Sequence, residues 1–93
     1  MRAGVKGRRL EHALRDILTQ CGFSVIRSAA SKTPFDLVAF SPRVVWLCQV
    51  KSNRWPSPAE REEMRRFPAP PGVRKWEFRF DDGNTFPEKR EVT

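Results

Sequence analysis

The sequence predicts an α/β domain, in which a mixed sheet of about four strands is flanked by helices in the order α-β-β-β-α-β. Three observations favour this class: apolar residues at helical spacing near the N-terminus, two apolar runs joined by a Ser-Pro turn within residues 34–51, and a capped helical segment before a last aromatic-rich run. A helix that connects two strands of one sheet usually makes them parallel, so we expect the third and fourth strands to be parallel.

Residues 7–21 are predicted to form an amphipathic helix that ends at Gly22. On a helical projection Glu11 borders the apolar face, whereas His12 lies nearly opposite it, as expected for a solvated histidine. The basic residues 1–6 ahead of this helix are expected to form a flexible arm. The apolar face consists of Leu10, Leu14, Ile17, Leu18 and Cys21.

The hairpin within residues 34–51 is the centre of the predicted sheet. If its turn spans residues 41–44, Asp36 lies beside Gln49 on one side of the sheet. A three-residue turn would instead place Asp36 opposite Cys48, so the two registers differ in the polar groups that they bring together. Strands are expected at residues 23–27 and 35–40 and from about residue 45 to 51 or 52, with a polar loop at residues 28–33.

The segment Ser57-Pro58-Ala59-Glu60 is a capping box with proline at the first helical position, and it predicts a short helix that runs towards Arg66. Met64 and Phe67 are the apolar anchors of this helix. Trp55, just before the capping box, is expected either to pack over the helix or a subunit interface or to stack on a base. The arginines expected to stay partly free are Arg61, Arg65 and Arg66.

Residues 74–80 alternate charged with aromatic side chains, which predicts a last strand. Its inward residues, together with Met64, either complete the core or form a dimer interface. After a turn at residues 81–84, the charged tail 87–93 is expected to fray. The inward residues of the strand are Trp76, Phe78 and Phe80.

The 93 residues are enough for a single domain, spanning residues 1–93, whose core is small enough that a second copy would help to stabilise it, and we expect a homodimer. A net charge of +7 points to a polyanionic partner such as a nucleic acid, with an inert basic surface as the alternative. Cys21 and Cys48 are expected to be buried free thiols of a reducing compartment. The sequence contains neither an apolar run long enough to span a membrane nor a signal-type region, so we expect no membrane partner and a cytoplasmic location.

Three polar residues interrupt the apolar hairpin: Asp36, Gln49 and Lys51. Buried polar groups require partners, a metal ion or a chemical role. The oxygen atoms of Asp36, Gln49 and Glu11, together with the Val50 carbonyl, suit a hard divalent cation. Lys51 lies on the same strand face as Gln49 and could stabilise developing negative charge. The bland alternatives remain open: Asp36 paired with Lys51, Glu11 paired with Arg8 or Arg15, and Lys51 as an ordinary lysine at a strand end.

In the order and spacing of its motifs the sequence resembles the PD-(D/E)XK nuclease superfamily and, within it, the archaeal-type Holliday junction resolvases. The resemblance covers about the first fifty-five residues. It implies a minimal restriction-endonuclease-like fold. The motifs that carry it are Gly7-Arg8-Arg9-Leu10-Glu11, Gly22-Phe23-x-Val25-x-Arg27, Ala30-Ser31, Pro34-Phe35-Asp36 and Gln49-Val50-Lys51-Ser52.

The resemblance also implies roles for individual residues. Glu11, Asp36 and Gln49 would bind Mg²⁺ or Mn²⁺, and Lys51 would orient or activate water. Arg27 and Ser31 would contact the scissile DNA. This sequence departs from the family pattern in having Gln49 where the family has Glu, which removes one negative charge from the metal site, and Ala30 where resolvases tend to have Gly.

The predicted function is therefore cleavage of DNA phosphodiester bonds at four-way junctions by a metal-dependent homodimer. The alternatives are a catalytically impaired nuclease fold that only binds DNA, a repair or restriction-type endonuclease that cuts linear or flap DNA, and a basic RNA-binding accessory protein. Further basic residues are expected to hold the DNA backbone. These are Lys6, Arg8, Arg9, Lys32 and Arg54.

Overall fold

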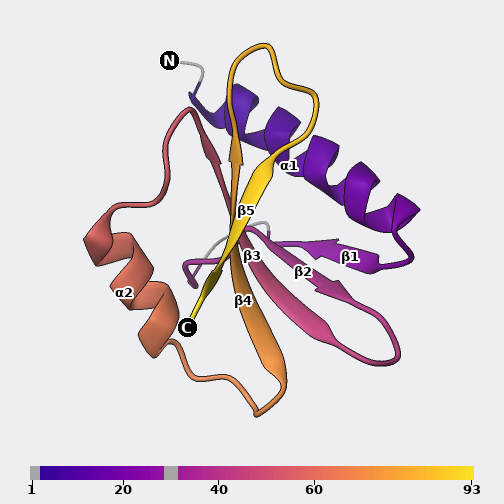
Figure 1. Ribbon diagram of the computed structural model, residues 1–93, viewed down its shortest axis with the longest axis vertical. Helices are drawn as coiled ribbons and strands as arrows, with labels where there is room; N and C mark the ends of the chain where they lie inside the picture. The colour runs from indigo at the N-terminus through magenta and orange to yellow at the C-terminus, as the bar shows by residue number, and fades with distance from the viewer. Residues whose placement is uncertain (1–2, 29–31) are drawn as a thin grey trace.

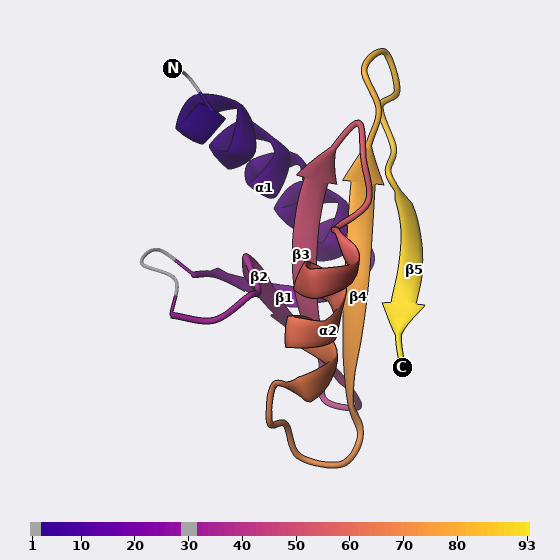
Figure 2. The same ribbon diagram turned by 90° about the vertical axis from the view of Figure 1, so that its left-hand side faces the viewer.

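The computed structural model describes residues 3–28 and 32–93, and in the first helix it describes side chains from residue 7 onward. A mixed sheet of five strands carries one helix on each face (Figures 1 and 2). The spatial order is β1-β2-β3-β4-β5; β3 and β4 are parallel, and all other neighbours are antiparallel. The elements are α1 (Ala3–Gln20), β1 (Ser24–Arg27), β2 (Leu37–Phe40), β3 (Val45–Ser52), α2 (Pro58–Arg66), β4 (Val73–Phe80) and β5 (Glu88–Val92). The predicted α/β class and the parallel third and fourth strands are confirmed.

Two apolar clusters lie on the two faces of the sheet. On the α1 face, Leu14 and Leu18 pack against β2, β3 and β4, where Cys48 and Phe78 are buried. On the α2 face, the fully buried Met64 packs with residues of a smaller cluster. Because side chains alternate along a strand, Gln49 and Lys51 project to the α2 face, on the opposite side from Cys48. The smaller cluster consists of Phe35, Met64 and Val92, with Leu47 and Phe67 packed against it.

The β2–β3 hairpin has the register predicted from a four-residue turn. Phe40 lies opposite Val45, and the turn is closed by a hydrogen bond of 2.9 Å from the Ser41 amide to the Val44 carbonyl. The paired ladder ends where Leu37 lies opposite Cys48. Asp36 therefore comes one residue before the strand, where its amide donates to the Cys48 carbonyl at 2.8 Å.

The charged tail does not fray as the sequence predicted. It forms the edge strand β5, which pairs antiparallel with β4 and brings the total to five strands. Val92 is only 5% exposed, in the cluster with Met64, and the guanidinium of Arg74 pairs with both carboxylate oxygens of Glu91 at 2.7 Å. Burial of one apolar side chain and ion pairs across the strands stabilise a segment that looked too polar to fold.

Two predictions for the first helix are corrected. The helix begins at Ala3, so most of the segment expected to be a flexible arm is helical. Cys21 is exposed, because α1 ends at Gln20 and Cys21 falls in the turn that leads to Gly22, which has a φ of 99°. Cys48 is buried and both thiols are free, as predicted. In the part of the chain that the structure describes, no helix has the length and apolar character needed to cross a membrane.

The capping box of α2 is confirmed. The Ser57 hydroxyl accepts a hydrogen bond from the Glu60 amide at 3.1 Å, and the Glu60 carboxylate accepts one from the Ser57 amide at 2.8 Å. Met64 anchors the helix with no exposed surface. The start of α2, close to the end of β3, is thus fixed by two reciprocal hydrogen bonds.

Candidate active site

Asp36 is a half-buried carboxylate at the entrance to β2. Its Oδ2 accepts a hydrogen bond from the Val50 amide at 2.8 Å. Burial raises the pKa of Asp36, the negative charge of Glu11 raises it further, and the Val50 hydrogen bond and the positive charge of Lys51 act in the opposite direction. Among the described residues no cation forms an ion pair with Asp36. The Asp36 carboxylate is thus held in place by a hydrogen bond, but no cation of the described residues pairs with it.

Gln49 supplies an oxygen atom that has no partner. Its side chain is 8% exposed, and its Nε2 donates to the Pro34 carbonyl at 2.9 Å, which fixes the direction of the amide. The Oε1 atom is buried and accepts no hydrogen bond in the described part of the chain. Buried polar atoms are nearly always satisfied, so an orphaned oxygen needs an explanation such as a missing ion.

Lys51 is held by the second helix. Its Nζ lies 2.8 Å from Oε2 of Glu60, the capping-box acid of α2. The hydrogen bond from Lys51 is the main reason that the pKa of Glu60 is lowered to about 2, with the Ser57 amide as the next contribution. The expected alternative, a direct Asp36–Lys51 pair, is not what the structure contains; Lys51 influences Asp36 only through its charge.

Glu11 and Arg27, for which the sequence predicted separate roles, are partners. Arg27 Nε lies 2.8 Å from Glu11 Oε1, and the two side chains are 35% and 18% exposed. This pair joins α1 to β1 and replaces the helical pairs expected with Arg8 or Arg15; Arg15 instead lies 3.6 Å from Asp16. Glu11 is nevertheless near enough to Asp36 to raise its pKa, so the structure brings Glu11, Asp36 and Lys51 into one neighbourhood.

These groups suit a hard divalent cation. The available oxygens are the Gln49 amide oxygen and the oxygens of Asp36 and Glu11 that the contacts above do not use. Within the described residues no three His, Cys, Asp or Glu side chains form a metal-binding group. The Val50 amide is committed to Asp36, and the role predicted for the Val50 carbonyl stays a prediction.

The residues predicted to bind DNA are spread over several elements. Arg8 and Arg9 are exposed on α1, Lys32 is exposed just before the hairpin, and Arg54 contacts Glu60 Oε1 at 3.4 Å. Ser31 and the side chain of Lys6 lie outside the described residues. The exposed arginines lie on α1 and just after β3.

A second carboxylate, which the sequence analysis did not identify, is fully buried. Glu77, in the middle of β4, has no exposed surface; Arg61 Nη1 lies 2.7 Å and Arg90 Nε 2.6 Å from its Oε1. The alternation of residues 74–80 placed Glu77 on an outward face, but the side chains of Arg61 from α2 and Arg90 from the neighbouring strand β5 lie against it on that face. Arg61 is therefore not one of the free arginines that the sequence predicted.

Trp55 packs against the same region. The guanidinium groups of Arg90 and Arg79 lie 4.3 and 5.9 Å from the centre of its ring, as in cation–π contacts. These contacts are with arginines of β4 and β5, whereas the sequence predicted packing over the next helix or a subunit interface, and the alternative of stacking on a base stays a prediction.

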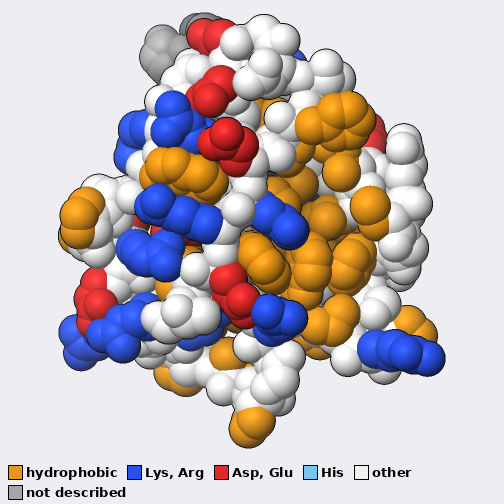
Figure 3. Space-filling model, viewed as in Figure 1, with side chains coloured by type: hydrophobic (Ala, Val, Ile, Leu, Met, Phe, Trp, Pro, Cys, Tyr) orange, Lys and Arg blue, Asp and Glu red, His pale blue; other side chains and the backbone are white. Residues whose placement is uncertain are grey.

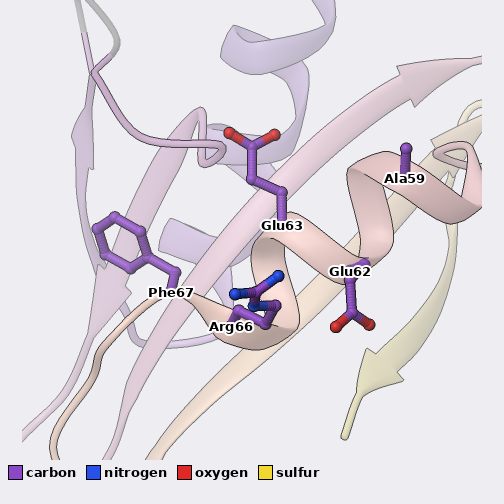
Figure 4. Close-up of a pocket in the computed structure, with 5 residues that line it drawn as sticks. All are labelled: Ala59, Glu62, Glu63, Arg66 and Phe67. Atoms are coloured by element: carbon purple, nitrogen blue, oxygen red, sulfur yellow. The ribbon is translucent and has the colours of Figure 1, made fainter.

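A shallow pocket on the surface of α2 is separate from these groups (Figure 4). The carboxylates of Glu62 and Glu63 point away from each other across the helix, so they do not converge on a ligand. The residues that line this pocket do not include Asp36, Gln49 or Lys51. Its lining residues are Ala59, Glu62, Glu63, Arg66 and Phe67.

A family model described as archaeal Holliday junction resolvase (Hjc) matches residues 2–65, a segment that contains Glu11, Asp36, Gln49 and Lys51. The chain belongs to the archaeal Holliday junction resolvase family. The fold of this family member is similar to that of Hjc, a Holliday junction resolvase from the archaeal hyperthermophile Archaeoglobus fulgidus, with a TM-score of 0.76 and 26% sequence identity over 92% of this chain and 77% of that chain. A comparison with curated protein sequences gives no match.

Proposed function

We propose that this resolvase-family protein is a metal-dependent endonuclease that cuts DNA at four-way junctions. The observation that carries the proposal is the register that sets the half-buried carboxylate of Asp36, which forms no ion pair among the described residues, beside Gln49 with its orphaned amide oxygen. The charge of Lys51, which follows Gln49 by two residues on the same strand face, also acts on Asp36. Membership of the family supports the nuclease chemistry and the choice of substrate.

Asp36, Gln49 and Glu11 would hold the cation, which we propose to be Mg²⁺ or Mn²⁺ because all their ligand atoms are oxygens. When bound, such a cation supplies Lewis-acid chemistry to phosphodiester hydrolysis and lowers the pKa of a water molecule. The orphaned Oε1 of Gln49 fits this role, because a ligand would satisfy its missing contact.

The residues of the chain have separate tasks in this proposal. The Val50 amide holds one oxygen of Asp36, and the Pro34 carbonyl orients the Gln49 amide, so both ligands are set before substrate arrives. The Lys51 ammonium would stabilise the negative charge that develops on the phosphate oxygens. Arg8, Arg9, Lys32 and Arg54 would contact the DNA backbone and add affinity that depends on salt.

The symmetric substrate suggests two copies of the chain. We propose that they meet through the apolar surface between α1 and the loop before β5 (Figure 3), where Phe86 is 71% exposed. Trp76, Phe78, Phe80 and Met64, which the sequence left open as an interface, contribute to the two clusters of the monomer, and of these four only Phe78 also lines the proposed surface. The surface is lined by Ile17, Leu18, Cys21, Phe23, Trp46, Phe78, Phe86, Pro87 and Lys89.

One observation favours a second function. Gln49 is a neutral ligand, so the metal site holds one negative charge fewer than a site with three carboxylates, and a protein with a weak site would bind junctions without cutting them. This alternative predicts equal junction binding with and without EDTA and no nicking in Mg²⁺ or Mn²⁺.

The test is cleavage of a four-way junction, a linear duplex and a flap in Mg²⁺ and in Mn²⁺. We expect the wild type to cut the junction preferentially and Asp36→Ala to be slower by at least about 100-fold, because the carboxylate that faces the cation is lost. Asp16→Ala, which removes an exposed carboxylate from α1, is the matched control and should cut at the wild-type rate. Equal cleavage by the wild type and Asp36→Ala would falsify the site.

A further inference from the structure

The ammonium group of Lys51 is bound to a residue outside the family motifs. Lys51 lies in β3 with a side chain that is 20% exposed, and its Nζ lies 2.8 Å from Glu60 Oε2. Glu60 belongs to the second helix and is 33% exposed. The contact therefore joins the end of the central strand to the start of α2.

Glu60 uses its two carboxylate oxygens for different purposes. Oε1 accepts the hydrogen bond from the Ser57 amide that completes the capping box, and Arg54 also approaches it at 3.4 Å. Oε2 is left to face Lys51. Because the capping bond fixes the carboxylate on its helix, the position of the ammonium group is set by the helix cap and not by the flexible lysine chain alone.

Without this contact Lys51 would have another anion to approach. Asp36 is a buried carboxylate with no ion-pair partner among the described residues, and the charge of Lys51 already acts on it. An Asp36–Lys51 pair would place an ammonium group on the oxygen that the cation requires. Glu60 supplies a competing anion at 2.8 Å from the Lys51 ammonium group.

We propose that Glu60 is a positioning residue that keeps the Lys51 ammonium group beside Asp36 but not bound to it. The inference rests on the proposed function, since it assigns Glu60 a role in the same site. It goes further in making the capping-box acid of α2 part of the machinery for DNA cleavage. The helix cap and the site would then be a single hydrogen-bonded unit.

Two variants separate the cap from the charge. Glu60→Gln keeps an amide oxygen for the Ser57 amide, and glutamine is accepted at this position of a capping box, but it presents an NH₂ group to Lys51. Ser57→Ala removes the hydroxyl that caps the Glu60 amide and leaves the Glu60 carboxylate on Lys51. The first variant removes the ion pair with little change in the helix, and the second weakens the helix with little change in the ion pair.

Under single-turnover conditions on a junction, we expect Glu60→Gln to lower the cleavage rate constant at least tenfold. The Mg²⁺ concentration needed for the half-maximal rate should rise. The affinity of this variant for the junction, measured in Ca²⁺, should equal that of the wild type. Ser57→Ala should cleave within twofold of the wild type while showing the lower thermal midpoint of the two variants. A merely structural role for Glu60 would give the opposite ranking, because activity would then follow the thermal midpoint.

A second readout does not depend on cleavage. In protein labelled with ¹⁵N-lysine, the ammonium resonance of Lys51 should be visible in the wild type and in Ser57→Ala, because the hydrogen bond slows proton exchange. In Glu60→Gln it should move to a different chemical shift, because Lys51 loses Glu60 and pairs with Asp36 instead. Lys75, which donates to the Arg65 and Phe67 carbonyls, is an internal reference that should not change.

The outcomes distinguish this inference from the proposed function. If Glu60→Gln cleaves within twofold of the wild type, or if its Lys51 resonance is unchanged, Glu60 does not position Lys51 and the inference is overturned. If the wild type and Asp36→Ala cleave alike, the proposed nuclease site fails. In that case an unchanged Lys51 resonance in Glu60→Gln would overturn the contact itself, and a shifted one would support it.

Discussion

Two carboxylates flank the central strand β3: Asp36 just before β2 and Glu77 in β4. Glu77 is fully buried, but two guanidinium groups lie within 2.7 Å of one of its oxygens. Asp36 is less deeply buried, forms no ion pair in the described part of the chain, and has a raised pKa. The comparison shows that the partner, more than the depth of burial, separates a structural carboxylate from one that can accept a cation.

The cost of burying a negative charge explains why the partners of Asp36 and Glu77 matter. A buried negative charge is costly unless a cation or several hydrogen bonds compensate for it. Arg61 from α2 and Arg90 from β5 compensate for Glu77 and at the same time fasten both elements to β4. At Asp36 the Val50 amide compensates only in part, and a divalent cation would complete the task.

Removing the charge of Glu77 should give the largest change in stability. We expect Glu77→Gln to lower the free energy of unfolding by about 3 kcal/mol, because Arg61 and Arg90 lose the buried anion that they share. Urea denaturation measures the loss. Glu62→Gln, which breaks an exposed pair with Arg65 on the same helix as Arg61, is the control and should change stability little. Similar losses for the two variants would remove the special role assigned to Glu77.

A change at Gln49 tests whether the site around Asp36 binds a metal ion. Gln49→Glu adds a carboxylate beside Asp36, so we expect the Mg²⁺ concentration that half-saturates the thermal shift to fall about tenfold, which corresponds to about 1.4 kcal/mol of binding free energy. The measurement is a thermal-shift titration with Mg²⁺. Gln20→Glu, at the exposed end of α1, carries the same chemical change away from the site. An unchanged titration for Gln49→Glu would place residue 49 outside the direct ligands of the metal.

A smaller effect should follow from neutralising Asp36 in EDTA. Since burial raises the pKa of Asp36 in the folded state, its ionised form opposes folding at pH values above its unfolded-state pKa of 3.8. Asp36→Asn should therefore stabilise the protein at pH 7, by about 1 kcal/mol. The gain should shrink as the pH falls towards 3.8, where Asp36 takes up a proton.

Urea denaturation at pH 7 and pH 4 checks this sign. Asp16→Asn, at an exposed position on α1, should show no comparable gain. A loss of stability in Asp36→Asn at pH 7 would mean that the Asp36 charge is compensated in the folded protein, in which case its site would resemble that of Glu77.

Local signals in the sequence determined most of the elements. The apolar spacing of residues 7–21 predicts α1, and the Ser57 capping box predicts the start of α2, because both depend on residues within one or two turns. The sequence left two lengths open for the hairpin turn, and the structure has the four-residue turn, which sets the register and the approach of Asp36 to β3. Asp36, Gln49 and Lys51 could therefore be named before the fold was known.

The tertiary structure alone decided which partners these side chains have. Glu11 binds Arg27, Lys51 binds Glu60, and Glu77 binds Arg61 and Arg90. In the three pairs with a side-chain hydrogen bond, Glu11–Arg27, Lys51–Glu60 and Glu77–Arg90, the partners are 9 to 16 residues apart in the sequence. An ion pair depends on where two elements pack, and nothing in the local pattern specifies it. For the same reason the burial of Glu77 and the edge strand β5 could not be predicted: each depends on a face or an edge that another element covers. The sequence thus determined which side chains could bind a cation or stabilise charge. The packing of the helices and strands decided which of these side chains form ion pairs within the protein.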